Sequence, residues 1–421
     1  MTTRDPRRGA VRFLVAASLA MLALSSWVVA PTAAAADRLP NLRAERPSEF
    51  HIVNINGRRL LRFSAVMHNN GAGPVEVLGR RANTHSPWVV SQVIDNDAGG
   101  ERRVETDATL YYSGDGHNHW HVKRMMAYHI FSPAVTRPDE KVGFCFFDTT
   151  LRYPSLPRSP SSSHYRESWC GTRSSLTSRT GISVGWGDRY QWSLPYQWVD
   201  ITGLPGGEYT VRAMVDPFDY FLETNETDSC GYTRVRFNAT GTSVAVLGSG
   251  SRCRTDWEDS SFEASVDWAL AEGISNGCDV LLYCPGASVT RAQMAMFLFR
   301  AMDLPQADQD YFTDDEGVTG ESSINAIAAA GITGGCAPGR FCPNTPVTRA
   351  QMATFLVRAL ELPGPVEPDH FIDDDASSHE RDIDSLAESG ITAGCSTDRY
   401  CPTKPVTRGQ MAAFLYRAFA N

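Results

Sequence analysis

Residues 331–363 read GITGGCAPGRFCPNTPVTRAQMATFLVRALELP, and closely related stretches begin at Gly273 and Gly390. The period is 58 and then 59 residues, nearly constant and slightly longer than that of most tandem repeats. Within each stretch, two cysteines stand six residues apart, and a later Thr lies three residues before a Gln. That Thr–Gln spacing is a capping box, after which apolar residues recur at helical intervals. Each repeat is therefore predicted to contain a helix, a loop pinned by a disulfide, and a second helix.

The whole chain is larger than this repeat array. It has 421 residues, which is long for a single hydrophobic core, so two or more domains are expected. A hydrophobic content of 42% and a charged content of 21% are close to globular averages and exclude a globally disordered chain. The formal net charge of −9 argues against nucleic acid as the main partner, because such a protein needs a basic surface to neutralise phosphates.

Residues 1–36 are predicted to be a signal peptide. Four arginines precede an apolar run over residues 13–30, and an alanine tract offers a cleavage site before Asp37. An uncleaved membrane anchor is the alternative, since the apolar run is nearly long enough to span a bilayer. Export places the ten cysteines in an oxidising compartment, where an even number suggests five disulfides.

The segment between the signal peptide and the repeats has a different pattern of apolar and polar residues. Short alternating runs such as RRLLRFSAVMHN (58–69), separated by Gly, Asn, Asp and Pro, predict an antiparallel β domain. A Ser/Arg/Pro-rich stretch, 153–180, interrupts this pattern, and loops of that length are either functional rims and lids or tolerated insertions. The small, flexible residues GSGS at 248–251 indicate a linker.

The predicted fold class is multidomain, with an antiparallel β-sandwich-like domain followed by all-α C-terminal repeats. The predicted boundaries are a signal peptide at 1–36, the β domain at 37–247, a linker at 248–253, and repeats at 254–305, 306–363 and 364–421.

The stretch GDGHNHWHV, residues 114–122, carries the most specific chemical signal in the chain. His117, His119 and His121 are spaced by two, so in an extended segment their imidazoles point to one face. Three neutral imidazoles that converge suit copper or zinc, and ligand type alone does not separate these metals. Three histidines on a solvated strand face, without metal, are the alternative.

Two later segments complete a family pattern. DEKVGFCFFDT (139–149) carries Lys141, and GISVGWGDRYQWSLPYQWVDIT (181–202) carries Tyr190. Together with the histidines, these segments resemble the catalytic domain of lysyl oxidase, a copper amine oxidase, over residues 39–253. The resemblance implies that the three histidines bind copper and that Lys141 and Tyr190 are joined as the cofactor lysine tyrosylquinone. Such enzymes use oxygen to convert primary amines, including peptidyl lysine ε-amines, to aldehydes with release of ammonia and hydrogen peroxide.

An oxidase of this kind needs a base near the quinone. Asp188 matches an Asp of the family motif and is the candidate, with Asp115 and His129 as further choices. An Asp in such a turn is more often a local backbone cap. If Lys141 is an ordinary surface lysine, or Tyr190 an ordinary domain tyrosine, the protein binds copper without oxidising amines. A zinc hydrolase is disfavoured because the chain lacks an H-E-x-x-H helix and a nucleophile elbow.

The disulfide framework departs from that of the animal enzymes, which carry a cysteine just ahead of the copper histidines and several more downstream. From their order alone, Cys145 is expected to pair with Cys170 and Cys230 with Cys253, although sequence does not settle connectivity.

The C-terminal repeats resemble S-layer homology domains, in a cysteine-bearing variety, over residues 254–421. The matching features are the GI-x-x-GC turn, the F/Y-C-P segment and the VTRAQMA helix. In that family the domains commonly hold proteins to the cell-wall polymer, which implies polymer contacts by Arg291, Arg349 and Arg408. Solvated first-turn arginines are the alternative. A Gln replaces the family Glu here, and 25 acidic against 11 basic residues from Arg254 onward require that binding of an acidic polymer be local.

The sequence therefore predicts a secreted, extracellular, cell-wall-associated copper amine oxidase. Its expected cofactors are copper and lysine tyrosylquinone, and its expected partners are protein or small primary amines, oxygen and the wall polymer. The alternative is a wall-attached copper-binding or adhesive protein without turnover.

Overall fold

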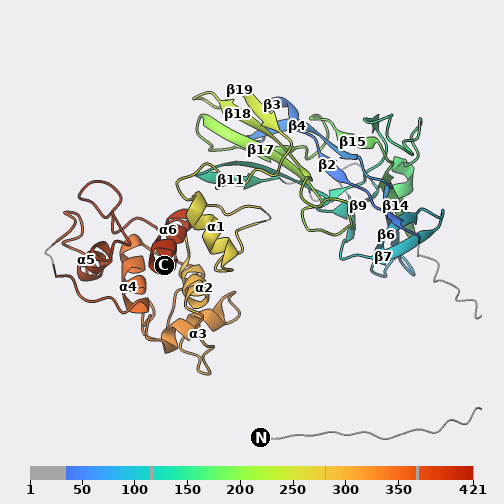
Figure 1. Ribbon diagram of the computed structural model, residues 1–421. Coiled ribbons are helices and arrows are strands. Elements are labelled where there is room, and N and C mark those ends of the chain that lie inside the picture. Colours follow the sequence, from blue (N-terminus) through green and yellow to red (C-terminus); the bar gives the residue numbers. More distant parts are fainter. Residues whose placement is uncertain are drawn as a thin grey trace, which may run out of the picture.

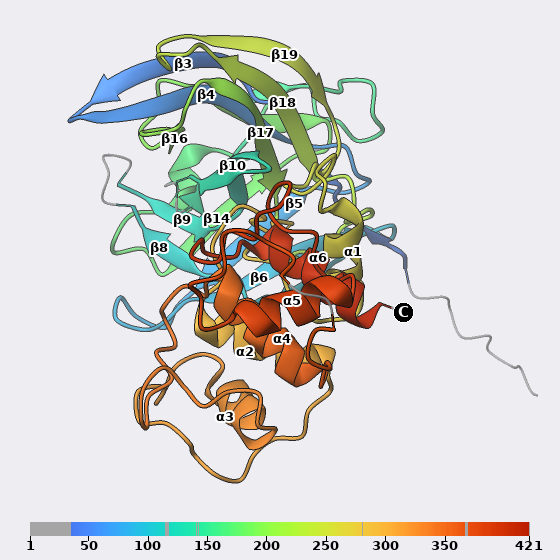
Figure 2. The same cartoon turned by 90° about the vertical axis from the view of Figure 1, so that its left-hand side faces the viewer.

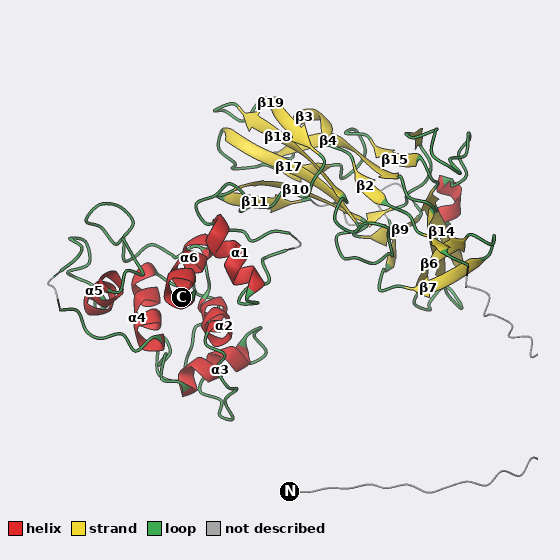
Figure 3. Ribbon diagram, in the orientation of Figure 1, coloured by secondary structure: helices red, strands yellow, loops and turns green. Residues whose placement is uncertain are grey.

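The computed structural model describes residues 35–113, 118–139, 141, 143–279, 281–366 and 369–420. Strands occupy the N-terminal part and helices the C-terminal part (Figures 1 and 3). The two parts meet where β10, β11 and β17 approach the loops that flank α1. The predicted signal peptide lies almost entirely outside the described residues. None of the described helices has both the length and the apolar composition needed to cross a bilayer.

Two large antiparallel sheets form the body of the N-terminal part. The first is built around the long central strand β4, and it contains β2 (Leu42–Ala44), β3 (Ser48–Ile55), β4 (Arg58–Asn69), β13 (Thr150–Leu151), β15 (Trp186–Tyr190) and β16 (Trp198–Asp200). The second runs in the order β11 (Val135–Pro138), β10 (Met126–Ser132), β17 (Gly207–Val215), β18 (Cys230–Phe237) and β19 (Val244–Gly250).

The hydrophobic core lies between these two sheets. Alternation of apolar residues along β4 buries Leu61, Phe63 and Ala65 against the second sheet. The ring of Phe63 meets Tyr128 of β10 edge to face, with ring centroids 5.1 Å apart. Burial of these aromatic and aliphatic side chains is the main stabilising term of the domain.

Two smaller antiparallel sheets complete the β domain. One contains β1 (Asp37–Arg38), β5 (Val75–Arg80), β6 (Val89–Asn96), β7 (Glu101–Glu105) and β14 (Thr177–Ile182). The other contains β8 (Leu110–Tyr112), β9 (Trp120–Lys123) and β12 (Gly143–Phe144). A short 3-10 helix, Glu167–Cys170, lies in the Ser-rich stretch.

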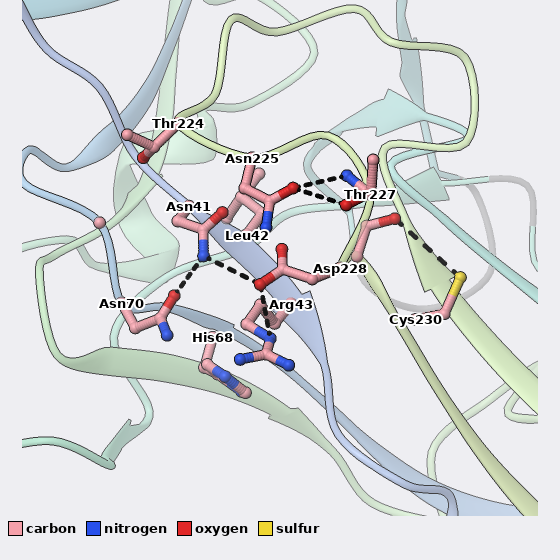
Figure 4. A network of polar contacts seen from close by, with 12 residues as sticks. Asn41, Leu42, Arg43, His68, Asn70, Thr224, Asn225, Thr227, Asp228 and Cys230 are labelled. Atoms are coloured by element: carbon pink, nitrogen blue, oxygen red, sulfur yellow. Dashed lines mark hydrogen bonds and ion pairs between the residues drawn. The ribbon is translucent and has the colours of Figure 1, made fainter. Parts of the chain in front are cut away.

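A polar network fastens β2 to the loop that precedes β18 (Figure 4). The side-chain amide of Asn41 donates to Asn70 at 2.7 Å and to Asp228 at 3.4 Å, and Arg43 pairs with the same Asp228 carboxylate. Because this loop lies far from β2 in sequence, these contacts fix the entry of the chain into β18.

The predicted disulfides Cys145–Cys170 and Cys230–Cys253 are both present, and the three repeat pairs are also bridged. The predicted linker is partly wrong. Gly248–Gly250 belong to β19, which pairs with β18 of the second sheet. Small residues suit this edge, where the Tyr232 ring lies close against Gly250.

Six helices lie in the described residues of the C-terminal part. They are α1 (Glu263–Ala271), α2 (Arg291–Ala301), α3 (Glu321–Ala329), α4 (Arg349–Ala359), α5 (Glu380–Glu388) and α6 (Arg408–Phe419). The three predicted capping boxes begin α2, α4 and α6. The prediction that this part is all-α is not well supported. Long loops join the helices, and isolated β-bridges such as Ser288↔Thr407 link the repeats.

The three repeats close into a ring. Helix α2 packs on α3 and α4 on α5, while α6, the last helix, packs on α1, the first (Figure 2). Trp268 of α1 meets Tyr416 of α6 with ring centroids 5.6 Å apart. One apolar core runs through all three repeats, so each repeat depends on its neighbours for burial.

Candidate active site

A cavity of about 490 Å³ opens beside β9, β12 and β15. It brings together residues from four separate parts of the sequence, and its lining includes His119, His121, Lys141, Glu167, Asp188 and Tyr190. His117 lies outside the described residues, so the third histidine of the predicted cluster is not placed.

The two described histidines lie side by side at the cavity wall. The rings of His119 and His121 have centroids 4.8 Å apart. Nδ1 of His121 lies 3.2 Å from the hydroxyl of Tyr111, the residue directly opposite it in the β8–β9 ladder. Nδ1 of His119 lies 3.4 Å from a carboxylate oxygen of Glu167.

These partners fit a metal site. A metal-ligating histidine usually has its other ring nitrogen held by a carboxylate or another polar group, which orients the ring. Because Nδ1 of His119 and of His121 is held in this way, Nε2 is the nitrogen of each ring suited to bind a metal. Neutral imidazoles match copper and zinc equally, so the donor set supports a metal of this class.

Lys141, which lies between β11 and β12, and Tyr190, the last residue of β15, meet in this cavity. The Lys141 Nζ lies 5.1 Å from the centre of the Tyr190 ring, and both side chains are buried. Phe144 packs edge to face against Tyr190, with ring centroids 4.9 Å apart. The Tyr190 hydroxyl donates to the carbonyl of Cys145 at 3.1 Å, so the disulfide-bonded segment orients the ring.

Asp188 shares a face of β15 with Tyr190, because the two residues are separated by one position in an extended strand. Burial raises the pKa of Asp188 to about 7. One carboxylate oxygen is buried with no hydrogen-bond partner among the described residues. Burial, together with the Asp188 charge, raises the pKa of the Tyr190 phenol well above 10.

Of the other two predicted bases, His129 lies away from this cavity and Asp115 is not among the described residues. His129 is buried in β10, where its Nδ1 lies 3.3 Å from a guanidinium nitrogen of Arg212, and it lines a different cavity. Of the three candidates, Asp188 is the one that the described structure places beside Lys141 and Tyr190.

Sequence reasoning missed Tyr111 and Glu167. Tyr111 carries a weak signal, since a two-stranded hairpin through GDGHNHWH would place it opposite a histidine. Glu167 had no local signal, because it comes from the Ser-rich stretch, which was open to two interpretations. That stretch contributes Glu167 to the cavity and Cys170 to a disulfide, so it forms part of the rim.

The comparisons with known proteins agree with the geometry of this cavity. The model of the lysyl oxidase family matches residues 90–247. The chain contains a lysyl oxidase domain. The S-layer homology domain model matches residues 311–353 and 372–412, within the second and third repeats. S-layer homology motifs indicate that the protein bearing this lysyl oxidase domain is associated with the cell surface and cell wall.

Individual relatives match the two parts separately. Lysyl oxidase homolog 2 of Bos taurus is 26% identical over 184 residues, which is 43% of this chain and 19% of that protein. An S-layer protein of Bacillus thuringiensis subsp. finitimus is 29% identical over 164 residues, 36% of this chain and 19% of the relative. An endoglucanase of Bacillus sp. is 38% identical over 108 residues, 26% of this chain and 11% of the relative. The matched segments therefore cover about a fifth or less of these relatives.

The arginines that follow the capping threonines are buried, which rules out the solvated alternative. Nε of Arg291 donates to the carbonyl of Phe341 in the next repeat at 2.7 Å, and its guanidinium lies 4.7 Å from the centre of that ring. Arg349 and Arg408 repeat this arrangement on Tyr400 and Tyr283. Arg291 also lines a cavity of about 320 Å³ between the first and second repeats.

Proposed function

We propose that the protein is a secreted, wall-attached copper amine oxidase that converts primary amines to aldehydes. The observation that carries this proposal is the position of Lys141, whose Nζ lies 5.1 Å from the Tyr190 ring centre in a cavity shared with His119 and His121. A buried lysine beside a buried tyrosine is costly without a functional reason, because desolvation penalises the charged amine.

His117, His119 and His121 would hold the copper, and the metal with oxygen would supply the oxidation that converts Tyr190 to a quinone joined to Lys141. The protein positions the partners for that reaction. Phe144 and the Cys145 carbonyl fix the plane of the Tyr190 ring, and the buried Lys141 amine is held next to it.

Asp188 supplies the base that amine oxidation needs. Its pKa of about 7 means that the carboxylate is available as a proton acceptor at neutral pH, yet is basic enough to take a proton from the carbon beside the substrate nitrogen. The cavity has room for an alkyl chain, since Phe144, Phe147 and Leu194 line it beside the polar groups. Small primary amines and lysine side chains both fit this description.

Peptide mass spectrometry of the copper-loaded, exported protein tests the proposal. A covalent link between the Lys141 and Tyr190 peptides is expected, and it should disappear in Lys141→Arg and in Tyr190→Phe. Lys123→Arg, which changes an exposed lysine of β9, is the matched control and should keep the link. Separate, unmodified peptides in protein that holds copper would refute the oxidase and support the non-catalytic copper-binding or adhesive alternative.

We further infer that the repeats hold the protein to an acidic wall polymer through Arg291, Arg349 and Arg408. One guanidinium nitrogen of Arg291 and one of Arg349 are buried without a hydrogen-bond partner among the described residues. Arg291 also lines the cavity of about 320 Å³ described above, where an anionic group of a polymer would meet its guanidinium charge. Sedimentation of the full protein with purified wall polysaccharide measures this, and loss of binding is expected in Arg291→Lys.

A further inference from the structure

The first repeat contacts the β domain through a segment that differs in sequence from the same segment of its two sister repeats. The contact lies where the β10–β11 hairpin meets the two loops that flank α1 (Figure 1). Three features fit the first repeat to the β domain: Gly286, Asp256 and the two backbone carbonyls that accept from Arg212.

Gly286 allows a close approach of the two domains. A Cβ built on Gly286 would overlap the backbone carbonyl of Ala134, in the β10–β11 turn. The backbone of Gly286 does not adopt a positive φ, so its conformation does not require glycine. At the same position, directly after Cys-Pro, the other repeats carry Asn344 and Thr403. The glycine is therefore explained by the contact with the β domain.

Asp256 is buried by the same contact. In every repeat, an aspartate accepts two backbone N–H groups from the disulfide loop; in the first repeat Asp256 accepts from residues 283 and 284 at 2.7 and 2.8 Å. Asp256 is only 1% exposed, whereas its counterparts Asp314 and Asp373 are half-buried. The hydroxyl of Thr136, from β11, donates to Asp256 at 2.8 Å. The β domain thus adds a third hydrogen bond to a carboxylate that its sister repeats leave partly in solvent.

Arg212 of β17 reaches across the same interface. Its side chain is fully buried, and one guanidinium nitrogen donates to the carbonyls of Arg254 and Leu281 at 3.0 and 3.1 Å. Asp256 and Asp279 lie near enough to stabilise its charge. Where the first repeat has the buried Leu282, the sister repeats have arginines, Arg340 and Arg399. The first repeat thus has no arginine at this position, and its loop carbonyls accept hydrogen bonds from an arginine of the β domain.

The docked loop also completes a second cavity beside Lys141. This cavity, of about 460 Å³, is lined by Lys141, Asp139 and His129 from the β domain and by Asp279 from the first repeat. Nε2 of His129 lies 3.8 Å from the Asp279 carboxylate. Lys141 lines both cavities, so the repeat forms one wall of the space behind the candidate catalytic lysine.

We propose that the first repeat is a fixed part of the catalytic unit, docked on the β domain through Gly286, Asp256 and Arg212. This docking fixes the orientation of the β domain, and therefore of the active-site opening, relative to the ring of repeats. Its Asp279 closes the cavity behind Lys141. The docking rests on the interface contacts alone, and only the consequence for Lys141 rests on the proposed function.

The variant Gly286→Asn tests the docking in the full chain. It installs the residue of the second repeat, which that repeat tolerates, so the first repeat should still fold while its contact with Ala134 is lost. The readout is tryptic cleavage after Arg254, whose carbonyl accepts from Arg212. Cleavage is expected to become about tenfold faster, because the peptide must leave the interface before it can be cut. Thr403→Asn makes the matched change in the third repeat and should leave the cleavage rate unchanged.

Calorimetry of the same proteins gives a second readout. One coupled unfolding transition for the β domain and the ring is expected in the wild type, and two separate transitions in Gly286→Asn. Equal cleavage rates and identical transitions in wild type and variant would overturn the proposal. If Gly286→Asn does not fold, Thr136→Val removes one interface hydrogen bond from the β-domain side, and faster cleavage is again required. The Lys141–Tyr190 cross-link is measured separately, so a failure of the oxidase proposal is distinguishable from a failure of docking.

Discussion

The β domain and the ring of repeats both bury charged side chains, but they do so in different ways. In the ring, Arg291, Arg349 and Arg408 each rest on the aromatic ring and carbonyl of the next repeat. In the β domain, Lys141 and Asp188 converge on one cavity next to two histidines. A charge that is buried against a repeated partner stabilises the fold, whereas charges that converge on a cavity are suited to chemistry. Variants in the β domain should therefore lower activity, and variants in the ring should lower stability.

The largest expected effect is in the β domain, at Lys141. Lys141→Arg keeps the charge but cannot form the cross-link, so peroxide release from a primary amine should fall by roughly a thousandfold or more. Thermal unfolding should change little. Lys123→Arg controls for the loss of a lysine, and full activity in Lys141→Arg would place the chemistry elsewhere.

Asp188 should give the next largest effect. Asp188→Asn removes the proton acceptor, so kcat should fall by about a hundredfold or more. In the wild type, kcat/KM should rise with pH through about 7, because the carboxylate accepts a proton only after losing its own, and burial holds its pKa at about that value. A steady-state pH profile measures both. A profile that stays flat from pH 5 to 9 would exclude Asp188 as the base.

In the ring, removal of Arg349 is expected to lower stability as well as binding of the wall polymer. Arg349→Met removes a 2.7 Å hydrogen bond to the Tyr400 carbonyl and the stacking on its ring, which should cost about 2 kcal/mol of unfolding free energy. Amine oxidation should be unaffected. The exposed Arg399 offers the matched control, Arg399→Met, for which urea denaturation should show almost no change.

The smallest expected effect concerns the orientation of a metal ligand. Glu167→Gln keeps the shape of the side chain that contacts His119 but removes its charge. Copper affinity should weaken by about tenfold, the lower end of such effects, since 62% of the Glu167 side chain is exposed to solvent. Competition with a copper chelator measures the affinity. Glu45→Gln, at a carboxylate paired with His68 outside this cavity, should leave it unchanged.

Patterns with a short range were readable from the chain. The run RRLLRFSAVMHN forms strand β4 over the same residues, 58–69, and the three capping boxes begin helices as expected. The disulfide pairs within the repeats follow from spacing, and Cys145–Cys170 and Cys230–Cys253 followed from order. Strand alternation, helix capping and the disulfides within the repeats depend on residues close together in sequence, so the sequence itself determined them.

Tertiary structure decided what depends on distant partners. Little in the sequence marks Tyr111 or Glu167 as site residues. Pairing of β8 with β9 places Tyr111 beside His121, and the Ser-rich stretch places Glu167 beside His119. GSGS looked like a linker, but a free sheet edge was available to pair with its first residues. The sequence gives no reason for a glycine at position 286, and the reason is the close approach of the Ala134 backbone in the folded protein. In each case the deciding contact joins residues that no local sequence pattern connects. Packing selects such partners by shape and charge in the folded molecule.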